Sequence, residues 1–144
     1  MHGLTRAIET TERGDVRRLQ PLRVLLAGSD RRFIRVTSFL LSQWGYHVAQ
    51  SSPRDTIEAA ERQRSDVVLL EMGDSRTTAW RRVAALQALP TVPTVVVVLD
   101  DGDEPWSIVP SIRKWTPIDE VIRAIEKAAL SLPTPLANDE AAQL

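Results

Sequence analysis

The segment Asp66-Val67-Val68-Leu69-Leu70-Glu71 decides the fold of this chain. Its central residues are all apolar, and no polar residue alternates with them. A continuous apolar run of this length is typical of a parallel strand that is covered on both faces. The segment therefore predicts a buried strand with a carboxylate, Glu71, at its carboxyl end.

Other segments predict strands on either side of this one. Residues 22–27 and 94–99 are short, apolar and rich in branched side chains, and residues 46–50 form a weaker candidate. A further strand is expected to begin at Ile108. Each of these runs is bounded by turn-forming residues, as strands usually are.

Helices are predicted between the strands. Asp30 can cap a helix that runs to about Trp44, with Gly45 as its terminator. Ser52 and Pro53 are expected to open a polar helix that ends near Arg64. The expected buried positions of the first helix and of the third, residues 78–89, are Phe33, Val36, Leu40, Leu41, Trp44, Trp80, Val83, Ala84 and Leu86.

The last helix has the clearest pattern. Thr116 is expected to cap it and Pro117 to open it. Its apolar residues follow helical spacing and form one stripe: Ile118, Val121, Ile122, Ile125 and Ala129. Because helices alternate with strands along the chain, we predict an α/β fold with a doubly wound, five-stranded parallel sheet.

Length and composition narrow the class of protein. The 144 residues fit one domain, with 43% hydrophobic residues, 26% charged residues and a net charge of −1. No field of one sign favours nucleic acid, and the longest apolar stretch, 95–99, is far too short for a membrane span. The absence of cysteine is compatible with a cytoplasmic protein.

The ends of the chain differ from its middle. Residues 1–21 are polar and mixed in charge, and we interpret them as an N-terminal extension without a secretory signal. Residues 22–132 carry the alternating pattern and form the expected domain. Residues 133–144 contain prolines and polar residues, and we expect a disordered C-terminal tail.

Several local patterns agree in order and spacing with one known family. The first strand leads into Gly28-Ser29-Asp30, and the first helix ends in Trp44-Gly45-Tyr46-His47-Val48. Val92-Pro93-Thr94 precedes four valines, and Lys114 stands six residues before Glu120. Together with the 66–71 segment, these features resemble the receiver domain of response regulators in two-component signalling. The resemblance covers about residues 22–130 and implies the strand order 2-1-3-4-5.

The resemblance also implies a phosphorylation site. In that family, two acidic residues after the first strand and an acceptor aspartate hold Mg²⁺, which assists phosphoryl transfer. A hydroxyl residue after the fourth strand and a lysine after the fifth contact the phosphoryl group. In this sequence the positions of the acidic pair are occupied by Gly28 and Ser29, and the acceptor position by Glu71. The position of the hydroxyl residue is occupied by Asp100, and the lysine is present as Lys114.

This set of residues departs from the family pattern at all positions except Lys114, and Trp115 replaces the proline that usually follows. Gly28 and Ser29 supply no carboxylate, so Asp30 is the acid that remains there. Mg²⁺ requires near-octahedral oxygen ligands at short distances. We therefore expect no cofactor and no true metal site. Asp30 and Glu71 are weak candidates for metal ligands, and Mg²⁺ would bind only if this degenerate pocket still holds the ion.

The connection between the fourth and fifth strands is unusually short. Residues 100–107 provide eight residues where the family places a helix. Eight extended residues reach at most ~26–29 Å, and a strand is about 17–20 Å long. We favour a nearly taut parallel return. The alternative is a hairpin at Asp101-Gly102, which would place Lys114 at the opposite end of the sheet from Glu71.

The roles of several residues stay open at this point. Glu71 is either a permanent substitute for a phosphorylated aspartate or a simple strand-end carboxylate, and Lys114 can pair with Glu71 or Asp100. Asp30 and Asp100 are more simply a helix cap and a turn residue than cation ligands. Trp106 and Trp115 belong either to the core or to an exposed patch for a partner, and His47 is an ordinary strand residue.

We expect an atypical receiver-like regulatory module that is not an enzyme, is not phosphorylated and acts through protein–protein contacts. The partner would be a sensor kinase, a regulator or an output protein, with a homodimer as a further option. Nucleic acid and membrane are not expected partners. The alternatives are a working phosphorelay response regulator with an unusual acidic pocket and a flavodoxin-like domain that binds a nucleotide or flavin. The usual glycine-rich phosphate-binding motifs of nucleotide-binding domains are absent.

Overall fold

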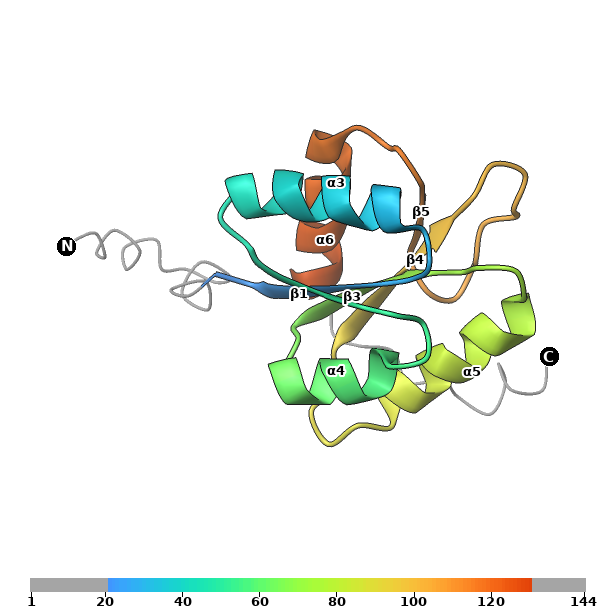
Figure 1. Cartoon of the computed structure of the whole chain (residues 1–144). Coiled ribbons are helices and arrows are strands. Elements are labelled where there is room, and N and C mark those ends of the chain that lie inside the picture. Colours follow the sequence, from blue (N-terminus) through green and yellow to red (C-terminus); the bar gives the residue numbers. More distant parts are fainter. Residues whose placement is uncertain (1–20, 131–144) are drawn as a thin grey trace.

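A computed structural model describes residues 21–130 of the chain, which form five strands and four helices (Figure 1). The strands are β1 (Arg23–Ala27), β2 (His47–Ser51), β3 (Val67–Glu71), β4 (Thr94–Leu99) and β5 (Ser111–Arg113). The helices are α3 (Arg31–Gln43), α4 (Thr56–Gln63), α5 (Arg76–Gln87) and α6 (Ile118–Leu130). The predicted tail, 133–144, and the predicted extension apart from Pro21 lie outside the described residues, as do the last two residues of the predicted domain, 131–132. No helix within 21–130 is long and apolar enough to cross a membrane.

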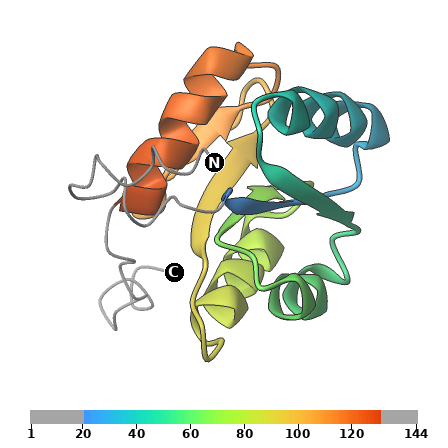
Figure 2. The same ribbon diagram turned by 90° about the vertical axis from the view of Figure 1, so that its left-hand side faces the viewer.

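The strands form one parallel sheet in the order β2-β1-β3-β4-β5, which confirms the predicted doubly wound α/β fold. Figure 2 shows α3 and α6 on one face of this sheet and α4 and α5 on the other. Two buried clusters fill the space on either side, so β1, β3 and β4 are covered on both faces. This double cover explains why their sequences are continuously apolar rather than alternating.

The central strand matches its prediction, and β4 spans the predicted residues. All residues of β3 are buried, including Glu71. Helix α6 buries Val121, Ile122 and Ile125 as the stripe predicts. Burial of this stripe against the sheet stabilises the helix more than its intrinsic propensity does.

Three local predictions were wrong in position. Helix α4 begins at Thr56 after Asp55, and Ser52 and Pro53 form a turn before it. Helix α5 begins two residues early because the Ser75 hydroxyl caps it by accepting from the Thr78 amide. Strand β2 is displaced by one residue.

The predicted buried face of α3 was also partly wrong. Phe33 and Leu41 are buried, but Val36 and Trp44 are 38% and 57% exposed. Ile34, Thr37 and Ser38 take the buried positions instead. Small polar side chains fit there because α3 packs closely over β1 and β2, whereas sequence periodicity alone favoured the larger apolar residues.

The connection between β4 and β5 contains eleven residues, 100–110, because β5 starts at Ser111 rather than at Ile108. Eleven extended residues reach ~36–40 Å, enough for the chain to return without strain. Residues of β4 and β5 pair in parallel, with Val98 opposite Ile112. The parallel return is therefore confirmed and the hairpin is excluded.

Candidate functional site

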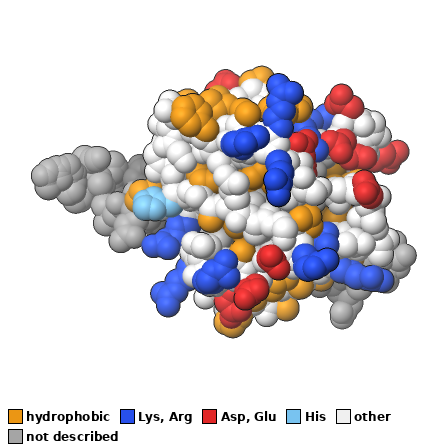
Figure 3. Space-filling model, viewed as in Figure 1, with side chains coloured by type: hydrophobic (Ala, Val, Ile, Leu, Met, Phe, Trp, Pro, Cys, Tyr) orange, Lys and Arg blue, Asp and Glu red, His pale blue; other side chains and the backbone are white. Residues whose placement is uncertain are grey.

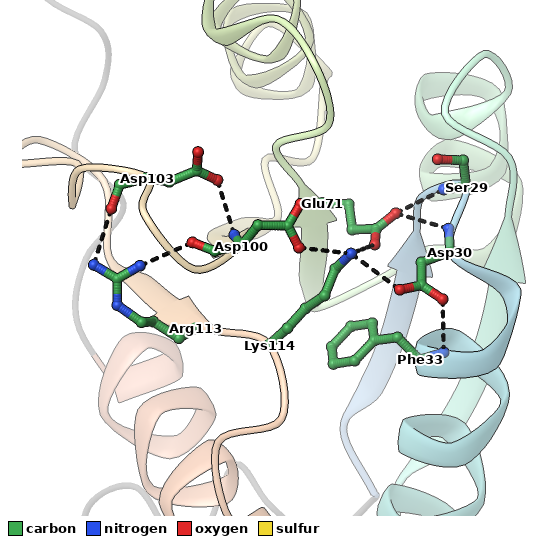
Figure 4. Close-up of polar contacts among 8 residues, drawn as sticks. All are labelled: Ser29, Asp30, Phe33, Glu71, Asp100, Asp103, Arg113 and Lys114. Carbon is green, nitrogen blue, oxygen red and sulfur yellow. Dashed lines mark hydrogen bonds and ion pairs between the residues drawn. The ribbon is translucent and has the colours of Figure 1, made fainter.

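Charged side chains from different parts of the chain meet at the carboxyl edge of the sheet. Glu71 ends β3, Asp100 follows β4, Lys114 follows β5 and Asp30 precedes α3 (Figure 4). The parallel topology brings the ends of these strands to one edge, which is where open α/β sheets usually carry their sites. The structure thus brings together four of the predicted site residues.

Lys114 lies at the centre of this cluster. Its Nζ atom is 2.7 Å from Glu71 Oε2, 2.9 Å from Asp100 Oδ1 and 3.1 Å from Asp30 Oδ2. The Lys114 side chain is only 15% exposed. One ammonium group therefore contacts all three carboxylates. The sequence left Glu71 or Asp100 as the partner of Lys114, and the structure shows both contacts.

Glu71 is the most buried member of the cluster, with its side chain 5% exposed. Its Oε1 atom accepts from the backbone amides of Ser29 at 2.7 Å and Asp30 at 3.0 Å. These amides lie at the N-terminus of α3, where unpaired N–H groups and the helix dipole favour negative charge. With Lys114 on the other oxygen, the buried carboxylate has partners on both sides.

Gly28 makes this arrangement of Glu71 sterically feasible. A Cβ atom added at Gly28 would lie 2.6 Å from Cδ and 2.7 Å from Cβ of Glu71. Both distances are far below van der Waals contact, and the Glu71 Cβ atom cannot move away without its strand. The glycine at position 28 is thus linked physically to the glutamate at position 71.

Asp30 has two functions in the structure. Its Oδ1 atom accepts from the Phe33 amide at 3.1 Å, which confirms the predicted helix cap, and its Oδ2 atom contacts Lys114. The hydrogen bond from the Phe33 amide, followed by the one from Lys114, lowers the pKa of Asp30 below its ordinary value. Asp30 is therefore held as a carboxylate at neutral pH.

The pKa of Lys114 reflects two opposing effects. Burial alone would lower this pKa, because an ammonium group loses hydration. The hydrogen bonds to Glu71, Asp100 and Asp30 outweigh burial and raise the pKa above its ordinary value. Lys114 is thus a fixed positive charge across the physiological pH range.

Arg113 supports Asp100 and was not predicted as a site residue. Its guanidinium group donates to the carbonyls of Asp100 and Asp103, each at 2.9 Å. The Asp100 amide in turn donates to Asp103 Oδ2 at 2.8 Å. These contacts close the turn that follows β4 and fix the position of Asp100. A lone arginine next to Lys114 gives no sequence signal for such a role.

The described residues do not fit a magnesium ion of the kind found in receiver domains. Gly28 and the exposed Ser29 offer no carboxylate at the acidic pair. Both oxygens of Glu71 are engaged, and the ammonium group of Lys114 lies between the three carboxylates. Within residues 21–130, no group of three or more potential ligand side chains could hold a metal.

The two tryptophans of this region have different environments. Trp106 is buried, which agrees with a place in the core, whereas Trp115 is 54% exposed. A role of Trp115 in partner contact stays a prediction. Trp115 has a left-handed backbone, with φ of 63°, and its ring meets Phe33 edge-on at 5.4 Å. Arg32 lies 5.9 Å above the same ring. His47 is exposed on β2, as an ordinary strand residue would be.

Comparisons with known proteins point to one class of fold. No model of a known protein family matches this sequence, and the search of curated protein sequences gives no significant match. Solved structures do match. The chemotaxis protein CheY4 of Vibrio cholerae is 14% identical, with a TM-score of 0.67, and the alignment covers 76% of this chain and 99% of CheY4.

Two further structures give the same result. FixJ-N is 22% identical, with a TM-score of 0.62 and coverage of 80% of this chain and 98% of FixJ-N. The receiver domain of a putative LuxO repressor protein from Vibrio parahaemolyticus is 15% identical, with a TM-score of 0.63 and coverage of 77% and 95%. The chain therefore has the fold of response-regulator receiver domains, as the sequence motifs predicted.

Proposed function

We propose that this chain is an atypical receiver-like regulatory module that acts by protein–protein contact and is not phosphorylated. The observation that carries this proposal is the closed ion-pair cluster at the position of the family's phosphorylation site. Lys114 contacts Glu71, Asp30 and Asp100 within 3.1 Å, and both oxygens of Glu71 have partners. No carboxylate at the end of β3 is left free to act as a nucleophile.

The geometry also supports Glu71 as a permanent substitute for a phosphorylated aspartate. The resemblance implies that the family's lysine contacts the phosphoryl group after transfer. Here Glu71 Oε2 is 2.7 Å from Lys114 Nζ without any added group. The extra methylene of glutamate places the charge at the lysine, and Gly28 leaves the space that this longer side chain needs. The domain would then have one signalling state rather than two.

A partner would recognise a surface of fixed charge beside this cluster. Figure 3 shows acidic side chains gathered on the side of the molecule that carries the β4–β5 connection. Asp100, Asp101 and Glu104 are exposed there. The proposed partner is a sensor kinase, a regulator or an output protein, or a second copy of this chain.

Intact mass spectrometry tests the proposal directly. The protein would be incubated with Mg²⁺ and acetyl phosphate beside a receiver domain that accepts phosphate. We expect a mass gain of one phosphoryl group on the control and none on this chain. A stable gain that maps to Glu71 or Asp74 would contradict the proposal and favour a working phosphorelay receiver.

The remaining expectations belong to the same proposal. The module would not be an enzyme, would need no cofactor or Mg²⁺, would bind neither nucleic acid nor membrane, and would act in the cytoplasm. A flavodoxin-like nucleotide or flavin site receives no specific support, because Lys114 and its carboxylates fill the region near Gly28 and Ser29. Unchanged flavin fluorescence during titration with the protein would agree with this.

A further inference from the structure

A cavity of about 530 Å³ lies away from the charge cluster, beside Trp106 and below the β4–β5 connection. Its walls come from the end of α5, the start of β4, residues 106–111 and α6. Helices α5 and α6 cover opposite faces of the sheet (Figure 2), so a cavity that both helices line passes around the edge of β4. One water molecule takes up only about 30 Å³, so this cavity has room for more than one side chain.

The edge of β4 is open at the cavity because β5 is short. Strand β4 has six residues, whereas β5 has three and pairs only with Val97, Val98 and Leu99. Thr94 and Val95 line the cavity, and no strand within residues 21–130 lies beside them on that side. An open strand edge accepts an extended segment, as in complexes where a peptide adds a strand to a sheet.

The lining of this cavity is mainly apolar. Val95, Trp106 and Val109 are buried and belong to the hydrophobic cluster on the α4 and α5 face of the sheet, and Ala128 contributes from α6. In the related fold a helix is expected between the fourth and fifth strands, and the connection here contains none. Such walls favour an apolar occupant, because docking removes apolar surface from water.

The chain that follows α6 starts beside this cavity. Ala128 lines the cavity, and α6 ends two residues later at Leu130, about 3 Å further along the helix axis. Residues 131–144 follow. An extended chain advances ~3.3–3.6 Å per residue, so Leu132 and Leu136 can lie up to about 7 Å and 21 Å from the end of the helix. Both leucines can therefore return to the cavity.

The first residues after α6, Ser-Leu-Pro-Thr-Pro-Leu-Ala at 131–137, favour an extended conformation. A residue before proline is disfavoured in the helical conformation, so Pro133 directs Leu132 away from the helix, and Pro135 has the same effect on the residue before it. Proline also reduces the conformational freedom that a segment loses when it docks. The segment has two leucines and no charged residue.

The spacing within this segment suits the open edge of β4. Leu132 and Leu136 are four residues apart, so an extended chain places both side chains on the same face. Pro133 and Pro135 occupy alternate positions between them, so both missing N–H groups fall on one side of the chain. Proline is tolerated in an edge strand when that side faces solvent. The other side keeps its N–H groups for the strand edge.

We propose that residues 131–137 of this chain occupy the cavity as an extended segment beside the start of β4. Leu132 and Leu136 contact the apolar walls. Because the segment is joined to one wall of the cavity, its effective concentration there is in the millimolar range, and weak contacts are enough to hold it. The expected disordered tail is then reduced to residues 138–144.

Nuclear magnetic resonance of the full chain tests this inference. Methyl groups of the two leucines should show nuclear Overhauser effects to the methyl groups of Val95, Val109 and Ala128. A mixture of isotope-labelled and unlabelled protein separates contacts within one chain from contacts between two copies, and we expect the former. Backbone order parameters should be higher in residues 131–137 than in residues 138–144.

Substitutions show whether the leucines hold the segment. Leu132→Ser and Leu136→Ser together should abolish the Overhauser effects, shift the amide signal of Val95 and lower the order parameters of the segment. Leu144→Ser is the matched control, because it changes a leucine of the same tail outside the docked segment, and it should alter none of these signals. Ala128→Leu adds volume to the cavity from its own wall and should release the segment in the same way as the double substitution.

Three outcomes would overturn the inference. One is order parameters in residues 131–137 that are as low as those in 138–144, with no Overhauser effect to the cavity walls. Another is Overhauser effects that arise only between labelled and unlabelled copies, since a second copy would then occupy the cavity. The third is a double leucine variant that changes the cavity signals no more than Leu144→Ser does.

Discussion

The charge cluster around Lys114 and the cavity beside Trp106 lie at opposite ends of the same connection but differ in how their polar groups are satisfied. At the cluster, one ammonium contacts three carboxylates, and Glu71 also accepts two backbone hydrogen bonds. In two residues that line the cavity, Trp106 and Gln87, a buried donor and a buried acceptor have no partners. Polar groups that already have partners gain nothing from a further one. A buried polar group without a partner carries a free-energy cost that a hydrogen bond would remove.

The largest expected effect comes from breaking the charge cluster. Lys114→Met would leave Glu71 buried with an uncompensated charge, and we expect a loss of about 3–5 kcal/mol in the free energy of unfolding. Arg123→Met is the control, because its pair with Asp119 is exposed on both sides and is worth only about 0.3–0.5 kcal/mol. Urea denaturation measures both values. A loss below about 1 kcal/mol for Lys114→Met would mean that solvent screens the cluster.

The next effect concerns how tightly the cluster is packed. Gly28→Ala places a methyl group against Glu71, and we expect it to cost about 1–3 kcal/mol, as overpacking usually does. Ser29→Ala is the neighbouring control, because the Ser29 side chain is exposed and only its backbone amide contacts Glu71. Thermal unfolding of the two variants compares them. Equal stability would show that β1 moves freely away from β3.

Filling the cavity should have the opposite sign. Ala128→Leu points added volume toward a hollow, and we expect it to stabilise the protein by about 0.5–1 kcal/mol. Ala79→Leu, at a fully buried position of α5 within the packed cluster, should instead cost about 1–3 kcal/mol. Both free energies come from denaturant unfolding curves, by comparing the midpoints of transitions that have the same slope. Destabilisation by Ala128→Leu would indicate that the hollow cannot accept side-chain volume.

The smallest expected effect is a decrease in protein stability at acidic pH, which arises at the charge cluster and not at the cavity. Asp30 has a pKa below its ordinary value of 3.8, so its contribution to stability is present above that value and is lost as the pH falls through the lowered pKa. Carbon NMR titration of the Asp30 carboxyl should show this low midpoint. In Asp30→Asn the loss of stability between neutral pH and pH 3 should be smaller, whereas an ordinary pKa in the wild type would disagree with the geometry.

Residues whose position depends on local pattern were predictable. The strand 67–71 follows from an unbroken apolar run, and the stripe of α6 follows from helical spacing. The motif Gly28-Ser29-Asp30 and the spacing from Lys114 to Glu120 located the site before any contact was known. These features depend on residues close in sequence, so their signal survives without knowledge of packing.

Other features were set by contacts between distant residues. Nothing in the local sequence separates Trp106, which is buried against Trp80, from Trp115, which is exposed beside Phe33. The start of β5 at Ser111 and the support of Asp100 by Arg113 likewise depend on how the connection closes over the sheet.

The amino-acid sequence by itself determined the order of strands and helices, the absence of the paired acids and the presence of glutamate at the end of β3. Only the tertiary structure decided that Lys114 reaches Glu71, Asp30 and Asp100 together, and that Gly28 makes room for Glu71. The physical reason is that secondary structure follows short-range periodicity, whereas the pairing of buried charges depends on distances between segments that fold from far apart in the chain.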